Sequence, residues 1–233
     1  LDQSEAALCA PAGKAQSAHV VKRLESDAKM RRKMITAPRD RSSAAGWYGP
    51  LLLAGLMAGL AAGGAPVRDA LALSRAGLQD AQLWRLLSAH FVHLGTYHAA
   101  LNLVGLAILA WLCPRPLRLR EWLRRLLWLS LAVSAGVWLM VPELNYYVGF
   151  SGVLHGLFLL GLAPQARAGD RIAVACLACL GGKLIWEMVV GVPLSDEQAI
   201  GGRVVTQAHL FGTLAALAYG LTFNTFARGD RHP

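Results

Sequence analysis

One segment of the chain combines a serine, a nearby histidine and several glycines. Residues 147–156 read YVGFSGVLHG, so Ser151 lies among glycines and His155 follows it four residues later. On a helix, side chains four positions apart lie on one face, one turn from each other. A serine hydroxyl attacks a carbonyl group only when a base removes its proton. The segment therefore indicates either nucleophilic chemistry or small residues that let helices pack closely.

Two other apolar segments carry polar residues that could complete such a site. One contains His98 and Asn102, one helical turn apart, and the other contains His209 in the run Ala-His-Leu-Phe-Gly. A polar side chain inside an apolar span is costly unless it faces the bundle interior or a wet cavity. His98 and Asn102 thus serve either as hydrogen bonds between helices or as donors to a developing oxyanion.

Two histidines are candidates for the base that activates Ser151. His155 is one turn away, but its reach and angle are constrained because both residues belong to one helix. His209 can approach from another span and later protonate the leaving amine. No aspartate or glutamate is evidently placed to orient His209, so the sequence predicts a dyad and not a triad. The spacing by itself leaves both bases open.

A charged pair lies within the fifth apolar segment. Lys183 and Glu187 are four residues apart, so they can neutralise each other on one face of a helix that must turn them inward. The pair is either an ion pair inside the bundle or a subsite for a polar group or a terminus of the substrate.

Metal and cofactor chemistry finds little support in the sequence. Cys176 and Cys179 have redox or metal-ligand spacing, but they lie inside an apolar run without a second ligand pair. The His-Glu-x-x-His motif of zinc proteases does not occur. We therefore expect no metal and no other cofactor.

The composition places these residues in a membrane protein. The 233 residues have a mean hydropathy of +0.41, and only 16% are charged, against about a quarter in soluble domains. Apolar windows of roughly membrane-crossing length predict an all-α bundle of six transmembrane helices. The expected spans are 47–66, 96–113, 121–141, 150–163, 171–191 and 204–225.

The positive charges indicate the orientation of these spans. The N-terminal tail, the second-to-third and fourth-to-fifth loops and the C-terminus hold 18 Lys and Arg residues, and the opposite loops hold four. The positive-inside rule places both termini in the cytoplasm. We expect a mobile basic tail over 1–46, a membrane domain over 47–225 and a short tail over 226–233. The charge then reflects topology and contact with membrane lipid, and no nucleic-acid partner is expected.

The fourth span is short. Its residues 151–163, before Pro164, number 13 and extend about 20 Å, roughly 10 Å less than the hydrocarbon core. If its end reaches the cytoplasmic interface, Ser151 is recessed in a cavity that opens outward, and the non-helical residues before it need shielding by protein. The spacing of Gly152 and Gly156 matches a stripe of small residues on the sixth span, which would bring His209 close.

Taken in order, these motifs resemble the rhomboid family of intramembrane serine proteases. The resemblance covers 47–225 and includes Trp84-Arg85, Arg85-x-x-Ser88-x-x-Phe91-x-His93, His98-x-x-x-Asn102, Gly149-Phe150-Ser151-Gly152 and Ala208-His209-x-x-Gly212. It implies that Ser151 is the nucleophile, that His209 is the general base, and that His98 and Asn102 form the oxyanion site. It also implies that the amphipathic outer segment 67–95 is the membrane-embedded loop of that family.

His155 departs from the commonest rhomboid pattern and resembles the rhombosortase subgroup. That resemblance implies membrane-anchored substrates with a C-terminal Gly-Gly segment, a transmembrane helix and a basic end, in a bacterial inner membrane with the site open to the periplasm. We expect His155, with His93, Gly149 and Gly152, to support the catalytic residues. The alternatives are an inactive rhomboid-like scaffold that binds transmembrane helices, and a channel or transporter with a histidine relay.

Overall fold

The computed structural model describes residues 22, 25–26, 47–113 and 117–226. The chain divides into two units, Leu1–Arg39 and Asp40–Pro233. In the first unit the three described residues are helical. Most of the predicted N-terminal tail and nearly all of the C-terminal tail lie outside the described residues, so the fold below is that of the second unit.

The first apolar segment is not one straight helix. Helix α2 (Tyr48–Ala62) ends at Gly63, and α3 (Gly64–Leu71) follows at an angle of 115°. Gly64 has φ +64°, a left-handed conformation that glycine adopts without steric cost. The expectation of a continuous span over 47–66 is therefore wrong at its outer end, because two successive glycines redirect the chain.

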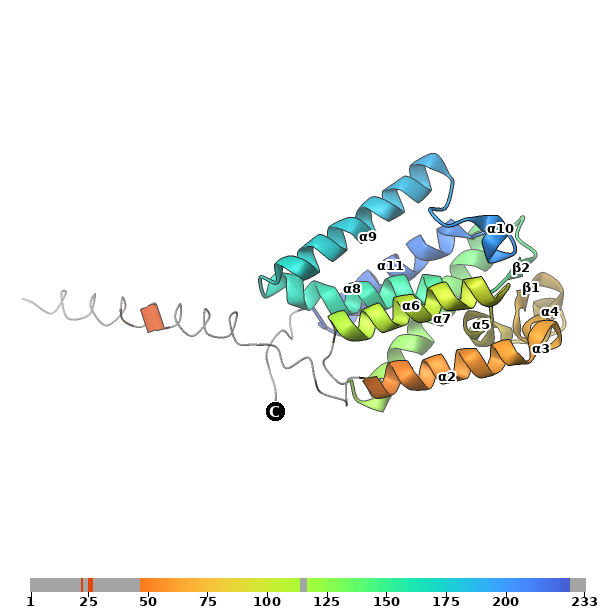
Figure 1. The fold of residues 1–233 in the computed structure, drawn as a ribbon, viewed down its shortest axis with the longest axis horizontal. Helices are drawn as coiled ribbons and strands as arrows, with labels where there is room; N and C mark the ends of the chain where they lie inside the picture. Colours follow the sequence, from red (N-terminus) through yellow and green to blue (C-terminus); the bar gives the residue numbers. More distant parts are fainter. Residues whose placement is uncertain (1–21, 23–24, 27–46, 114–116, 227–233) are drawn as a thin grey trace, which may run out of the picture. The chain divides into compact units, whose positions relative to one another are not determined.

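The segment that follows α3 consists of short elements at one end of the bundle (Figure 1). They are β1 (Leu73–Ser74), α4 (Arg75–Gln79), α5 (Arg85–Ser88) and the 3-10 helix η2 (Ala89–Phe91). Strand β1 pairs antiparallel with β2 (Tyr146–Tyr147), in the register Leu73 to Tyr147 and Ser74 to Tyr146. This pairing connects the outer segment to the residues that lead into Ser151.

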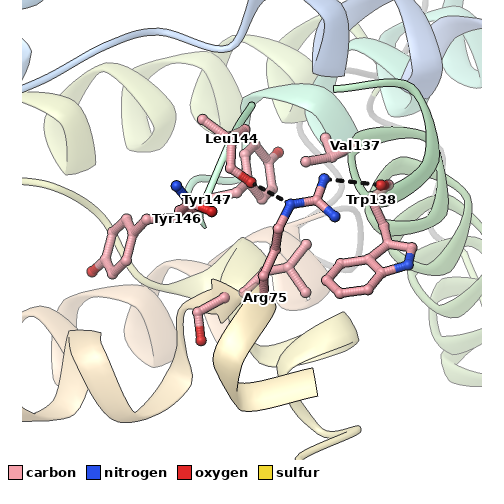
Figure 2. Close-up of a pocket in the computed structure, with 9 residues that line it drawn as sticks. Arg75, Val137, Trp138, Leu144, Tyr146 and Tyr147 are labelled. Atoms are coloured by element: carbon pink, nitrogen blue, oxygen red, sulfur yellow. Dashed lines mark hydrogen bonds between the residues drawn. The ribbon is translucent and has the colours of Figure 1, made fainter. Parts of the chain in front are cut away.

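Arg75 stabilises the contact between this segment and the residues before Ser151. Its guanidinium group donates hydrogen bonds to the carbonyl oxygens of Leu144, Trp138 and Val141 at 3.0–3.1 Å, and it lies 4.5 Å from the centre of the Trp138 ring. Figure 2 shows this side chain beside Leu144 and Trp138, in a small pocket that Tyr146 and Tyr147 also line. Because an arginine has five donors in a rigid plane, one residue can join three carbonyl groups and hold the outer segment in place.

The remaining described helices form the bundle in Figure 1. They are α6 (Thr96–Leu112), α7 (Leu119–Met140), α8 (Ser151–Arg167), α9 (Arg171–Val190), the short α10 (Glu197–Ile200) and α11 (Thr206–Thr222). By length and composition, α7 and α9 could each cross a membrane. The bent pairs α2–α3 and α5/η2–α6 also qualify if each pair is one span. The protein is thus a helical membrane protein, and the count of six spans stays a prediction.

Helix α8 is longer than the sequence predicts. Pro164 lies inside it, and the helix continues to Arg167 for a total of 17 residues, or about 25 Å. Proline removes one backbone donor but does not have to end a helix when its surroundings tolerate the lost bond. The expected deficit of roughly 10 Å is therefore reduced to about 5 Å. The residues before Ser151 are nevertheless shielded, since Tyr147, Val148 and Phe150 are buried.

The main apolar core joins α2, α6, α7, α8 and α11. Large side chains from these helices fill it, and its fully buried members include Leu106, Leu129, Phe150, Val153, Leu160 and Tyr219. Within the core, α8 and α11 approach most closely at glycines. A Cβ atom on Gly212 would overlap the carbonyl oxygen of Gly152, and one on Gly156 would lie 2.7 Å from the carbonyl oxygen of Gly212. Small residues thus bring the two helices to backbone contact.

Helix α9 is much less covered by the rest of the bundle. Its buried residues are Ala173, Leu184 and Glu187, whereas large apolar side chains such as Ile185 and Val189 are exposed. Exposed apolar side chains on a membrane helix suit contact with lipid. Glu187 is the only charged residue among the buried positions of this helix.

Candidate active site

Ser151 is the first residue of α8, and the residues that lead into it from β2 are buried. Gly149 has φ +121°, and a Cβ atom there would lie 2.8–2.9 Å from ring atoms of His98. Its N–H donates to the carbonyl of Ala89 at 3.0 Å, and its carbonyl accepts from the Tyr147 hydroxyl at 3.2 Å. Only glycine suits this position, because both the backbone conformation and the space exclude a side chain.

His209 reaches Ser151 from α11. Its Nε2 atom lies 3.0 Å from the Ser151 Oγ atom, within the range expected of a base that removes a proton. The two residues meet because α11 lies directly against the start of α8. A Cβ atom on Gly152 would be 2.8 Å from the carbonyl oxygen of Ala208. The sequence interpretation of matching small-residue stripes agrees with this packing.

Glu187 is the carboxylate that contacts the second ring nitrogen of His209. Its Oε2 atom lies 2.8 Å from Nδ1 of His209, and only 1% of its side-chain surface is exposed. The expectation that no carboxylate orients His209 is therefore wrong. The order of the spans could have indicated this contact. Glu187 lies near the end of the fifth span and His209 near the start of the sixth, so both lie at the same end of the bundle. Because Glu187 lies four residues after Lys183, the sequence suggested an ion pair separate from the serine and the histidine.

Lys183 completes this group. Its Nζ atom donates to Glu187 Oε1 at 2.6 Å and lies 3.2 Å from His209 Nδ1. The predicted pair of Lys183 and Glu187 is thus formed, but it belongs to the same constellation as the serine and the histidine. We call Ser151, Lys183, Glu187 and His209 the base cluster.

His155 packs on the base cluster and does not bind the serine hydroxyl. Its ring stacks on that of His209, with 4.2 Å between centroids and 12° between planes. Its Nδ1 atom lies 2.7 Å from the carbonyl oxygen of Ser151. Since a carbonyl oxygen only accepts, that nitrogen carries the proton. Of the two histidines considered as bases, His209 is the one within hydrogen-bond distance of Ser151 Oγ.

The predicted oxyanion residues lie on α6, beside Gly149. His98 and Asn102 are both buried, and the Asn102 amide donates to the His98 carbonyl at 2.9 Å. His98 Nδ1 lies 3.5 Å from the Leu94 N–H, a long contact that favours a proton on Nε2, the atom next to Gly149. His93 stacks edge-on against His98 at 5.0 Å between ring centroids. We call His93, His98 and Asn102 the donor cluster.

The start of α8 adds further hydrogen-bond donors. The first N–H groups of an α-helix have no acceptor within the helix, and the helix dipole makes this end electropositive. The N–H groups of Ser151 and Gly152 stand at that end of a 17-residue helix. Negative charge that develops beside Ser151 Oγ would therefore meet backbone donors on one side and the donor cluster on the other.

A cavity of about 290 Å³ borders the base cluster between the C-terminal end of α9 and the start of α11. Its wall includes Glu187, Arg203 and Gln207, together with loop residues around Pro193. Charged and polar side chains line it next to the His209 partner Glu187. Glu187 is the residue of the base cluster that lines this cavity.

Metal ligands do not gather at this site. Among the described residues, no group of three or more His, Cys, Asp or Glu side chains is placed to hold a metal ion. Cys176 and Cys179 lie on α9 without forming a disulfide, and Cys179 is exposed. The arrangement instead provides a hydroxyl, an imidazole base, a carboxylate and a set of N–H donors, which are the components of acyl transfer.

Comparison with known proteins gives one clear relation. A search of curated proteins finds no match, but the family model of the rhomboid domain matches residues 80–226. That range begins in the outer segment before α5 and runs to the end of α11, so it contains both clusters. It covers more than half of the chain, and the protein therefore belongs to the rhomboid family.

Proposed function

We propose that the protein is an intramembrane serine endopeptidase in which Ser151 is the nucleophile and His209 is the general base. The observation that carries this proposal is the 3.0 Å contact between His209 Nε2 and Ser151 Oγ, at the start of α8 and inside a rhomboid domain. Rhomboid proteins are generally proteases of this type, although inactive members exist.

The chemistry follows from the atoms in contact. His209 takes the proton of the Ser151 hydroxyl while Oγ bonds to the carbonyl carbon of the scissile peptide. The resulting oxyanion is stabilised by the backbone N–H of Ser151 and by His98 and Asn102. The C–N bond then breaks as His209 returns the proton to the leaving amine. Water attacks the acyl-enzyme by the same route, releasing a carboxylic acid and restoring the hydroxyl of Ser151.

For the substrate, we propose membrane-anchored proteins with a Gly-Gly segment before a C-terminal transmembrane helix and basic residues. The likeness of the His155 motif to rhombosortases supports this class, and glycine suits a tight site because its backbone can approach closely. By the distribution of positive charge, both termini face the cytoplasm. The cleavage site then opens to the periplasmic side of a bacterial inner membrane.

A fluorophosphonate probe tests the nucleophile without a known substrate. The full chain is purified in detergent, and covalent labelling is compared among the wild type, Ser151→Ala, His209→Ala and Ser130→Ala. We expect labelling of the wild type, none of Ser151→Ala, and a rate about 10²–10⁴-fold lower in His209→Ala. Ser130 is a matched control because it is a buried serine on α7, a helix that supplies no residue of the base cluster or the donor cluster, so its variant is labelled normally.

A membrane reporter tests the substrate class. It carries a Gly-Gly segment, an apolar helix and terminal arginines, and its partner reporter replaces both glycines by leucine. We expect cleavage of the glycine reporter by the wild type and by Ser130→Ala only. Cleavage or labelling that survives Ser151→Ala excludes the serine mechanism. A wild type that binds the reporter helix but neither cleaves it nor reacts with the probe is the alternative, an inactive scaffold.

A further inference from the structure

The Nδ1 atom of His209 faces two groups that make opposite demands on it. Glu187 Oε2 lies 2.8 Å away, and Lys183 Nζ lies 3.2 Å away. A carboxylate accepts hydrogen bonds and requires a proton on Nδ1, whereas an ammonium group donates and requires a bare Nδ1. A neutral imidazole has one proton for its two nitrogens, so only one of these neighbours can be satisfied.

The choice between them decides whether His209 can act as a base. With the proton on Nδ1, the Nε2 atom offers a lone pair to the Ser151 hydroxyl, 3.0 Å away. With the proton on Nε2, that nitrogen can only donate, and the hydroxyl proton has no acceptor there. Glu187 therefore favours the tautomer that activates Ser151, and Lys183 by itself would favour the tautomer that does not.

Burial makes the two charged residues depend on each other. Glu187 is 1% exposed and Lys183 is 27% exposed at the side chain, with 2.6 Å between Oε1 and Nζ. A buried carboxylate without a partner is strongly destabilising, so Lys183 supplies the charge that lets Glu187 stay ionised next to His209. In return, Glu187 draws the Lys183 ammonium group to Oε1 and away from Nδ1.

We infer that Glu187 is a positioning residue that selects the active tautomer of His209, and that Lys183 is its counter-ion and an inhibitor of the base whenever Glu187 is neutral. This inference rests on the proposed function and extends its dyad to a Ser151–His209–Glu187 triad, in which the carboxylate is paired with the Lys183 ammonium group. No proton passes to Glu187. When His209 takes the proton of Ser151, the carboxylate stabilises the imidazolium through the existing Nδ1–H contact.

The inference predicts an unusual interaction between two substitutions, measured by the rate of fluorophosphonate labelling. Glu187→Gln keeps the shape but leaves Lys183 unneutralised beside Nδ1, and we expect a loss of about 10²–10⁴-fold. Lys183→Met alone should also slow labelling, because Glu187 then loses the charge that keeps it ionised next to His209. The double variant Glu187→Gln/Lys183→Met should react at least about tenfold faster than Glu187→Gln. Removing the lysine is then harmful in the wild type and beneficial after Glu187 is neutralised.

Two further variants separate positioning from general support of the fold. Glu187→Asp keeps the charge and should retain more of the labelling rate than Glu187→Gln. Leu184→Ala removes the neighbouring buried apolar side chain of α9, so it loosens the same helix without touching the proton arrangement. It should lower thermal stability and leave the labelling rate per folded molecule within about threefold of the wild type.

Nitrogen NMR of histidine-labelled protein gives a readout that does not need activity. The His209 signal, identified by its loss in His209→Asn, should report a proton on Nδ1 in the wild type and on Nε2 in Glu187→Gln. The double variant should return to the Nδ1 form. An unchanged tautomer in Glu187→Gln, or a double variant no faster than Glu187→Gln, overturns the inference. If the tautomer differs between the wild type and Glu187→Gln as expected but the wild type is not labelled, the proposed function is refuted and the inference about the tautomer stands.

Discussion

The two halves of the site differ in how completely their polar atoms are paired. In the base cluster, every functional atom already contacts another, at distances of 2.6–3.2 Å. In the donor cluster, the shortest contact is the 2.9 Å hydrogen bond within α6 from Asn102 to the His98 carbonyl. Among the described residues, Asn102 Oδ1 and both ring nitrogens of His93 have no hydrogen-bond partner although they are buried.

This difference matches the two tasks that acyl transfer requires. A base has to be oriented before the substrate arrives, because the tautomer and direction of its ring decide whether it can accept a proton. An oxyanion site meets its acceptor only when the substrate carbonyl becomes charged. The Asn102 side-chain nitrogen has two N–H groups, and one of them donates to the His98 carbonyl, so the other can donate to a substrate oxyanion when it forms.

The largest effect expected from this comparison is the loss of a donor. His98→Ala should slow acylation by the fluorophosphonate probe about 10²–10³-fold, because the phosphoryl oxygen of the probe occupies the oxyanion position. His98→Gln keeps an N–H group and should retain part of the rate. Stopped samples analysed for adduct formation over time provide the measurement.

His90→Ala is the matched control for that prediction. His90 is a fully buried histidine whose Nε2 atom lies 3.0 Å from both the Ser130 carbonyl and the Ser134 hydroxyl. Its loss should lower thermal stability in detergent while leaving the rate per folded molecule near that of the wild type. Equal slowing in His90→Ala and His98→Ala would mean that His98 contributes packing and not a donor.

A second, smaller effect tests whether the base cluster depends on the contact between α8 and α11. Gly212→Ala places a Cβ atom against the carbonyl of Gly152, so the helices must separate and His209 must move from Ser151. A displacement of roughly 1 Å can cost about 10²-fold in rate. The rate of fluorophosphonate labelling should fall about 10²-fold, whereas the affinity for a substrate helix should change less.

Gly182→Ala provides the corresponding control on a surface without contacts. An added Cβ atom there meets nothing within 4 Å, and alanine favours a helix by about 0.5–1 kcal/mol over glycine. This variant should keep the wild-type rate and gain slightly in thermal stability. If both glycine variants behave alike, the close contact of α8 and α11 does not set the position of His209.

The sequence was informative where chemistry depends on short spacing and weak where it depends on the arrangement of helices. It predicted that Ser151 and His209 meet, because glycines at four-residue intervals allow helices to approach closely. It missed the contact between Glu187 and His209, since the rotation of α9 about its axis is set by packing that no local pattern encodes. The sequence also predicted that the fourth helix ends before Pro164. Proline commonly ends helices in soluble proteins, but inside a membrane bundle neighbouring groups can compensate for the one backbone hydrogen bond that it removes.

The smallest expected effect concerns His155, which touches the base cluster without sharing its hydrogen bonds to the serine hydroxyl. The variants His155→Phe and His155→Leu separate its two contacts, the stacking on His209 and the Nδ1 contact to the Ser151 carbonyl. Phenylalanine keeps a ring for stacking and loses the donor, whereas leucine loses both.

Aromatic stacking contributes about 0.5–1.5 kcal/mol beyond the burial of area, which corresponds to roughly 2–13-fold in rate. His155→Leu should therefore label up to about tenfold more slowly than His155→Phe, and both should remain well above His209→Ala. Labelling in His155→Phe that is as slow as in His155→Leu would assign the effect to the Nδ1 donor. In that case the carbonyl of Ser151, and not the ring of His209, would be what His155 holds, and the base cluster would be complete without it.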